Sequence, residues 1–186
     1  MRRIFCLVIA LLTLSGCSPG RTDPIDGMKL RRNLLESNGC SFDMQICANY
    51  GEAYYDFSVS CVSDSSGNIH FEVLKPETIQ GIKGRIDAGN GQLAFEDVVL
   101  ALPSLADGEL MPVYAPWIFL NTLRNGYMKD QGIVDGLLCM TIMDSFADDA
   151  LLLRIYLNSS GIPVNCDIFW KGRSSLSIKI ENFQIL

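Results

Sequence analysis

The sequence is poor in histidine, the side chain that catalytic and metal sites use most often. Its single histidine, His70, lies inside a strand-like stretch beside Phe71, and a catalytic triad or metal site built on it would need partners that the sequence does not mark. The phosphate-binding pattern G-x-x-x-x-G-K-[ST] and the calcium-loop pattern D-x-[DN]-x-[DN]-G are absent. Neighbouring carboxylates occur at Glu96–Asp97 and Asp148–Asp149, where they are usually solvated. We therefore expect a protein that is not an enzyme and that holds no metal or cofactor.

Positive charge is also scarce. The chain has 15 lysines and arginines against 21 aspartates and glutamates, a net charge of −6. Recognition of nucleic acid needs a basic surface, and docking on anionic lipids needs juxtamembrane lysines and arginines. The composition argues against both kinds of partner.

The apolar stretch at the N-terminus, Ile4 to Leu14, is short. A membrane-spanning helix needs about 20 apolar residues. The stretch follows Met-Arg-Arg and precedes small residues, which is the layout of a secretory signal. We expect residues 1–16 to be a signal peptide.

The segment Leu14-Ser15-Gly16-Cys17 resembles the lipobox of bacterial lipoproteins. In that family the cysteine thiol receives a diacylglycerol, the signal is cut before it, and the new amine is acylated. The resemblance implies lipidation of Cys17, with residues 17–26 as a tether; the alternative is an ordinary signal with a chance cysteine. Two lipid chains give stable anchoring. The expected location is the extracytoplasmic face of the cell membrane, or the outer membrane of an organism with two membranes.

Five cysteines remain beyond Cys17, and their spacing matches no zinc pattern. An odd number leaves at least one unpaired within a monomer. We expect them to be small buried apolar residues on strands. The main alternative is one disulfide among Cys40, Cys47 and Cys61. The other two cysteines of the set are Cys139 and Cys166.

The remaining chain, 27–186, reads as one domain. Asp26 is a candidate cap for a helix over 27–37, which Gly39 would end. Apolar and polar residues then alternate in stretches separated by turns rich in Gly, Asn, Asp and Ser, which indicates strands with one buried face. These stretches are 41–47, 54–62, 69–76, 82–87 and 92–102.

The second half repeats this order. A loop with three prolines (103–116) leads into a predicted helix over 115–130, in which Pro116, Leu120, Leu123 and Tyr127 stand at helical spacing. Turn signals then recur every 8 to 12 residues, which favours an antiparallel meander. Its predicted strands are 136–146, 150–158, 163–171 and 175–185. The pattern predicts an α+β fold with one large antiparallel sheet and helices on its apolar face.

The segments 71–86, 91–102 and 112–127 resemble proteins of the LolA/LolB-like superfamily, as does the C-terminal run 153–185. The last part shares turn and strand-end residues with that family, at Gly161, Pro163, Gly172, Asn182 and Phe183. The resemblance implies a half-open, curved antiparallel β-barrel whose concave face is covered by two or three helices. The chain is also similar to clostridial lipoproteins of the GerS type, which share this fold and bind a cell-wall amidase.

Two functions follow from this resemblance, and both are forms of binding. The first is a membrane-anchored module that binds an envelope or cell-wall protein, for which we expect an apolar patch on an edge strand or the outer face. The second is an acceptor of lipid or lipoprotein acyl chains, which uses a cavity between sheet and helices. The candidate lining residues of that cavity are Phe57, Trp117 and Leu120.

Overall fold

The computed structural model describes residues 26–186, except 52, 96–97, 103–104 and 107–108, and except the side chains of 95–99 and 102–109. The expected signal peptide (1–16), Cys17 and nearly all of the tether (17–26) lie outside these residues. So do the predicted acidic pair at 96–97 and part of the loop 103–116.

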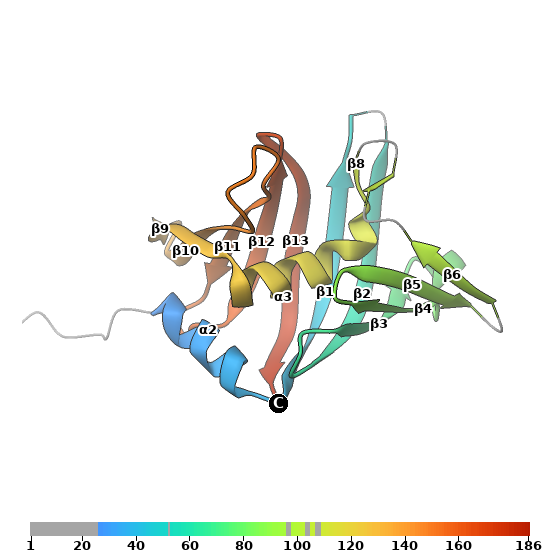
Figure 1. Cartoon of the computed structure of the whole chain (residues 1–186), viewed down its shortest axis with the longest axis horizontal. Coiled ribbons are helices and arrows are strands. Elements are labelled where there is room, and N and C mark those ends of the chain that lie inside the picture. The colour runs from blue at the N-terminus through green and yellow to red at the C-terminus, as the bar shows by residue number, and fades with distance from the viewer. Residues whose placement is uncertain (1–25, 52, 96–97, 103–104, 107–108) are drawn as a thin grey trace, which may run out of the picture.

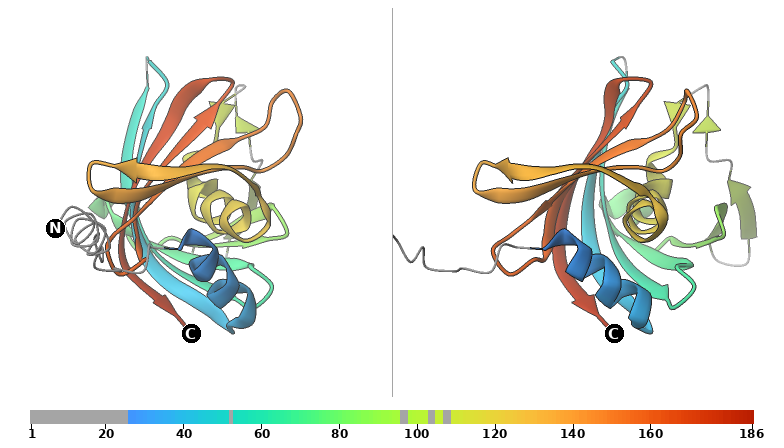
Figure 2. Two further views of the ribbon diagram at one scale, coloured as in Figure 1. Left: turned by 90° about the vertical axis from the view of Figure 1, so that its left-hand side faces the viewer. Right: turned by 60° about the vertical axis from the view of Figure 1, so that its left-hand side comes forward.

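Eleven strands form one antiparallel sheet (Figure 1). In spatial order the strands are β6, β5, β4, β3, β2, β1, β13, β12, β11, β10 and β9. In the described part of the chain, two α-helices lie on the concave side of the sheet (Figure 2). The element bounds are α2 Gly27–Glu36, β1 Gly39–Asn49, β2 Tyr54–Asp64, β3 Ile69–Lys75, β4 Lys83–Asp87, β5 Asn90–Phe95, β6 Val98–Leu102, α3 Ala115–Asn125, β9 Tyr127–Val134, β10 Leu137–Met143, β11 Leu152–Leu157, β12 Pro163–Trp170 and β13 Arg173–Ile185.

The order of the strands explains why a helix crosses the sheet. Each half of the sheet is a meander, and the two halves join where β1 pairs with β13. The strands β6 and β9 are therefore the two edges, and the chain between them must pass from one edge to the other. It does so over the concave face, through the short strands β7 (Leu105–Ala106) and β8 (Glu109–Leu110), the 3₁₀ turn η2 (Pro112–Tyr114) and α3.

The alternation in the sequence sets which face of the sheet is buried. Every second residue of the central strands is apolar and buried, as in Phe42, Met44 and Ile46 of β1 and Leu153, Ile155 and Leu157 of β11. The helix α3 contributes Phe119 and Leu120, both fully buried, and the rings of Phe42 and Phe119 meet edge to face at 5.8 Å. The predicted α+β fold, with a large open sheet and helices on its concave face, is confirmed.

The predicted helix over 115–130 is too long. The helix α3 ends at Asn125, Gly126 is extended, and Tyr127 begins β9, whose pairing with β10 supplies the hydrogen bonds that a longer helix would have made. The predicted strand 92–102 is two strands, β5 and β6, which pair as a hairpin. The helix α2 ends at Glu36, with Ser37 as its cap, so Gly39 opens β1 and does not end the helix.

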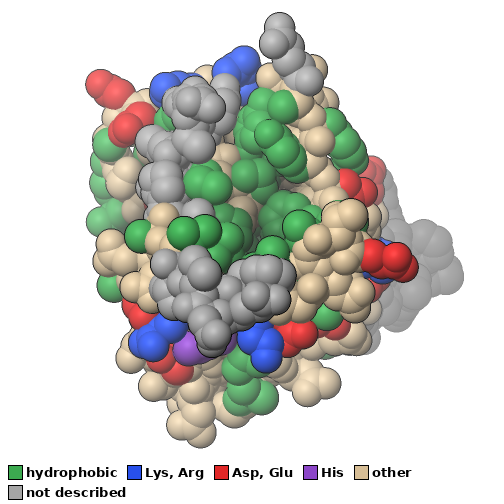
Figure 3. Space-filling model, turned by 90° about the vertical axis from the view of Figure 1, so that its right-hand side faces the viewer, with side chains coloured by type: hydrophobic (Ala, Val, Ile, Leu, Met, Phe, Trp, Pro, Cys, Tyr) green, Lys and Arg blue, Asp and Glu red, His purple; other side chains and the backbone are tan. Residues whose placement is uncertain are grey.

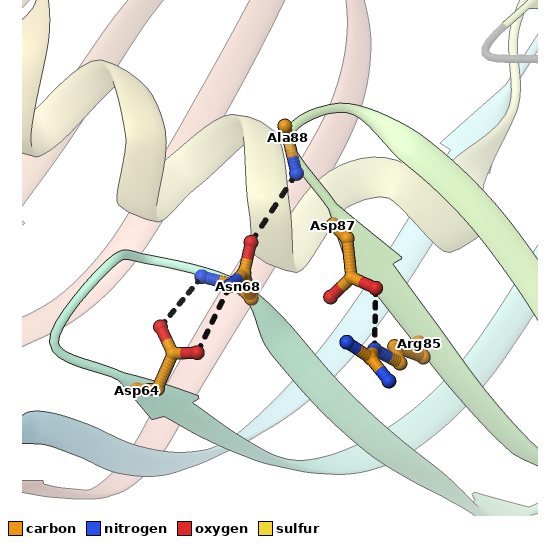
Figure 4. A network of polar contacts seen from close by, with 5 residues as sticks. All are labelled: Asp64, Asn68, Arg85, Asp87 and Ala88. Atoms are coloured by element: carbon orange, nitrogen blue, oxygen red, sulfur yellow. Dashed lines mark hydrogen bonds and ion pairs between the residues drawn. The ribbon is translucent and has the colours of Figure 1, made fainter.

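A polar network joins two turns at one end of the sheet (Figure 4). The Asp64 carboxylate accepts hydrogen bonds from the backbone N–H of Ser66 at 2.8 Å and of Asn68 at 3.0 Å, and from the Asn68 side chain at 2.9 Å. The Asn68 amide oxygen accepts from the Ala88 N–H at 3.3 Å. The β2–β3 turn is thereby tied to the β4–β5 turn, where Ala88 and Gly89 both have positive φ.

Two arginines tie the helices to each other at their C-terminal ends. Arg31 of α2 donates to the carbonyl of Leu123 at 2.7 Å and to that of Gly126. Arg124 of α3 donates to the carbonyl of Leu34 at 3.4 Å and to that of Ser65 at 2.6 Å. Each arginine thus reaches at least one carbonyl at the C-terminal end of the other helix, where the helix cannot satisfy it itself, and Arg124 also binds the β2–β3 turn.

Replacing Arg31 by alanine should remove this cap. We expect Arg31→Ala to lower the free energy of unfolding by about 1–3 kcal/mol, since hydrogen bonds that involve a charged group are lost from part-buried carbonyls. The neighbouring Arg32 is exposed, and Arg32→Ala should stay within about 0.5 kcal/mol of the wild type. Urea unfolding followed by circular dichroism measures both; equal stability of the two variants would contradict the role given to Arg31.

Asp64 makes the stability of the β2–β3 turn depend on pH. Its slight burial favours a higher pKa, but the hydrogen bonds from Asn68, Ser66 and Gly67 outweigh that and lower the pKa of Asp64. A carboxyl whose folded pKa is depressed stabilises the fold above its unfolded value of about 3.9, and that contribution is lost as pH falls through the folded pKa.

We therefore expect Asp64→Asn to be less stable than the wild type at pH 7, by less than about 1 kcal/mol because the site is solvated. The difference should shrink as the pH falls below about 4. Urea titrations at several pH values measure it, with Asp148→Asn on an exposed turn as the control. A difference that stays constant across this range would show that the Asp64 charge has no part in the turn.

Candidate functional site

A mainly apolar pocket lies on the concave side of the sheet, beside η2. Its volume is about 480 Å³. Figure 3 shows hydrophobic side chains around a hollow on the side of the molecule that carries β4, β5 and β8. The lining residues are Tyr50, Ala53, Tyr55, Phe57, Phe71, Val73, Ile79, Ile82, Leu93, Leu110, Met111, Pro112 and Val113.

The pocket exists because α3 begins too late to cover this part of the sheet. The helix starts at Ala115, and the preceding segment, Leu110 to Tyr114, covers the sheet with a single turn of 3₁₀ helix. Two tyrosine hydroxyls anchor this segment. The Tyr50 hydroxyl donates to the Leu110 carbonyl, and the buried Tyr114 hydroxyl accepts from the Gly91 N–H at 2.8 Å.

Two glycines let aromatic rings lie against the strands at this end of the sheet. A Cβ atom on Gly84 would stand 2.0 Å from the Phe71 ring, and one on Gly91 would stand 2.4 Å from the Tyr114 hydroxyl. Any larger side chain at either position would displace the ring. Gly84 therefore sets the position of Phe71 in the pocket, and Gly91 sets the position of η2 above it.

None of the lining residues carries a charge. Burying a charged or unpaired polar group among them would cost several kcal/mol, whereas an apolar group would gain about 25 cal/mol per Å² removed from water. The volume and the aromatic and aliphatic lining are those of a ligand site. The pocket can bind an apolar group, and the hydroxyls of Tyr50 and Tyr55 are among the few polar groups in its lining.

The structure places the three predicted lining residues in different surroundings. Phe57 lines the pocket. Leu120 of α3 is fully buried and belongs to the hydrophobic core. Trp117 packs against the core from a half-buried position, with its ring next to the Gly89 turn.

Sequence reasoning missed most of the pocket. Phe71 and Val73 alternate with polar residues in the predicted strand 69–76, which places them on its buried face but does not assign them to a pocket. The loop contributions, Ile79, Ile82, Met111 and Val113, have no periodicity that would assign them to one site.

Two other hollows are more polar. One of about 840 Å³ lies between α2 and the β11–β12 turn, with Asp26, Lys29, Asn33 and Gln131 in its lining. Another of about 550 Å³ lies on the outer face, with Asp167 and Lys179 in its lining. Their charged and amide groups are those of an ordinary solvated surface.

The five cysteines are free, and all but Cys47 are buried. Burial raises the pKa of the Cys61 and Cys166 thiols well above the usual value, which makes them unreactive. His70 is exposed on β3, opposite Arg85 of β4. Within the described residues, no group of three or more His, Cys, Asp or Glu side chains is placed to hold a metal ion. Nor does that part of the chain contain a helix that is long and apolar enough to cross a membrane.

Comparisons with known proteins find similar solved structures. No protein-family model and no curated protein sequence matches the chain. A LolA superfamily protein from Nitrosomonas europaea aligns with a TM-score of 0.48 and 9% identity, covering 86% of this chain and 93% of that one. A putative outer-membrane lipoprotein-sorting domain from Vibrio parahaemolyticus gives 0.47 and 8%, covering 87% and 91%.

A chain from the complex of the CwlD amidase with the GerS lipoprotein of Clostridioides difficile gives a TM-score of 0.44 and 16% identity, covering 91% of this chain and 99% of that one. All three TM-scores are below 0.5, and the identities are 16% or less. These likenesses therefore decide neither the family nor the function of this chain, and the LolA-like resemblance stays a prediction from the sequence.

Proposed function

We propose that the protein is a lipid-anchored binding protein whose pocket beside η2 takes up an apolar group, with an acyl chain of a lipid or lipoprotein as the ligand class. The observation that carries the proposal is the uncharged, largely aromatic and aliphatic lining of a 480 Å³ pocket. The pocket needs no cofactor, and the protein acts without catalysis.

The exposure of the lining residues suits a chain with one polar end. Phe71 and Val73 are nearly buried, whereas Tyr55 and Ile79 are 51% and 39% exposed. A hydrocarbon chain can lie on the inner residues while its polar end stays in water at the outer ones. Each buried CH₂ would contribute about 0.8 kcal/mol before the cost of association is subtracted.

The anchor is the second part of the proposal. Residues 1–16 are the signal peptide, Cys17 carries the lipid, and residues 17–26 tether the domain 27–186 to the extracytoplasmic face of the membrane. The lipobox-like segment and the apolar stretch before it support this assignment. The other predicted function, binding of an envelope protein, would use the outer surface and is compatible with the same anchor.

A charge at the mouth of the pocket should abolish uptake of an apolar probe. We expect Ile79→Asp to weaken binding of the neutral fluorophore N-phenyl-1-naphthylamine to residues 25–186 by about tenfold or more, because a carboxylate would face an apolar ligand. Ala53→Trp, which fills part of the pocket, should have the same effect. Fluorescence titration measures both.

Ile162 provides a matched control, since it is also 39% exposed but borders the polar hollow beside α2. Ile162→Asp should bind the probe like the wild type. Absence of saturable binding to the wild type, or an equal loss in Ile162→Asp, would refute the role of the pocket. Native mass spectrometry of the domain from its own host would then show whether an endogenous lipid is bound at all.

Replacing Cys17 should separate anchoring from ligand binding. In cells fed radiolabelled palmitate, the wild type should incorporate label and sediment with membranes, and Cys17→Ala should do neither. Label in Cys17→Ala, or an unlabelled wild type, would exclude lipidation at this residue. Probe binding by residues 25–186 does not depend on this result.

A further inference from the structure

Two aromatic rings are exposed to solvent at the β9 edge of the sheet. Tyr127, the first residue of β9, is 50% exposed, and Phe146 in the β10–β11 loop is 76% exposed. Their ring centroids are 4.3 Å apart, with an angle of 43° between the planes. Exposed apolar residues are common singly, but two aromatic rings in contact form a ready-made patch.

The loop that carries Phe146 is held in shape by its own hydrogen bonds. Asp144 and Leu151 join the two ends of the loop. The backbone N–H of Asp144 donates to the Leu151 carbonyl at 3.1 Å, and the Asp144 carboxylate accepts from the Leu151 N–H at 2.8 Å. Ala150 N–H donates to the Ala147 carbonyl at 3.1 Å near the tip. A residue displayed on an ordered loop loses little entropy on binding, which favours its use as an anchor.

The charged residues next to Phe146 in its own loop are negative, while β9 carries Lys129 two residues from Tyr127. Asp148 and Asp149 follow Phe146 and are exposed. An anionic membrane surface would repel them. A symmetric contact with a second copy would bring the acidic residues of both loops together. A protein with a basic rim around an apolar socket complements both the rings and the carboxylates.

We propose that Tyr127 and Phe146 form the anchor of a protein-binding surface, and that its partner is an envelope protein with an apolar socket ringed by lysine or arginine. Phe146 enters the socket, Tyr127 supports it, and Asp148 and Asp149 pair with the basic rim. The strand β9 is an edge of the sheet, so unpaired backbone groups lie beside the anchor and can extend the contact. This surface is separate from the pocket beside η2, and its test does not depend on that pocket.

The test uses the full-length protein in membranes of its own host. A photo-crosslinking residue, p-benzoylphenylalanine, replaces the exposed Lys129 of β9, and adducts are identified by mass spectrometry. The captured protein is then purified, and its affinity is measured against the full-length wild type and three variants. These are Phe146→Ala, the double charge reversal Asp148→Lys with Asp149→Lys, and Leu100→Ala, which removes a 57% exposed side chain from the opposite edge.

We expect Phe146→Ala to weaken binding about tenfold or more at both low and high salt, as for a central anchor. The charge reversal should weaken binding mainly at about 50 mM salt and remove most of its salt dependence. Leu100→Ala should bind like the wild type. Unchanged binding of N-phenyl-1-naphthylamine in every variant would show that the fold and the pocket are intact.

Several outcomes would overturn the proposal. They are the absence of any protein adduct, an adduct with lipid only, and an adduct with a second copy of the chain only. Affinity that is the same in Phe146→Ala and Leu100→Ala would also overturn it, as would stronger binding after charge reversal.

Discussion

The need to cover one apolar face of an open sheet governs the rest of this structure. Eleven strands spaced about 4.8 Å apart would span about 48 Å if the sheet were flat. The helix α3 has 11 residues and is therefore about 16 Å long. The helix α3 is therefore too short to cover the whole sheet. Part of the remaining width is covered by α2 and by the segment before α3, and the curvature of the sheet reduces the width that must be covered. The side chains from β2, β3 and β5 that remain uncovered form the pocket beside η2.

The sequence predicts the covered face well, because alternation is a local property. Ile69, Phe71 and Val73 face inward as their spacing indicates. The C-terminal end of α3 is harder to predict, because Tyr127 continues the helical spacing of Leu120 and Leu123. Gly126 weakens the helix only locally; what ends it is the pairing of β9 with β10, in which Tyr127 faces Met143 sixteen positions away. A pattern within one segment cannot contain a partner that lies in another.

The pocket, too, depends on contacts between segments that are distant in the sequence, which no local pattern contains. Phe57 could be named from its strand, but the space beside it depends on where a distant loop comes to rest. That position is set by the contact of the Tyr114 hydroxyl with Gly91 and of the Tyr50 hydroxyl with Leu110. Each pair joins residues that are 23 and 60 positions apart, respectively. Trp117 and Leu120 were natural candidates because they are apolar and helical, yet apolar helical residues are also what fills a core.

The helix α3 separates the two surfaces that the structure presents. Its N-terminal end continues from η2 at the pocket, and its C-terminal end leads through Gly126 to Tyr127 at the aromatic pair. Between them, Phe119 and Leu120 are fully buried, and Arg31 holds the carbonyls of Leu123 and Gly126. A helix fixed at its middle and at one end acts as a rigid spacer of about 16 Å, and sites this far apart are usually independent. If occupation of the pocket does change the affinity of the aromatic pair for its partner, the partner must change the affinity of the pocket by the same factor. Any such coupling would have to displace α3 against a filled core.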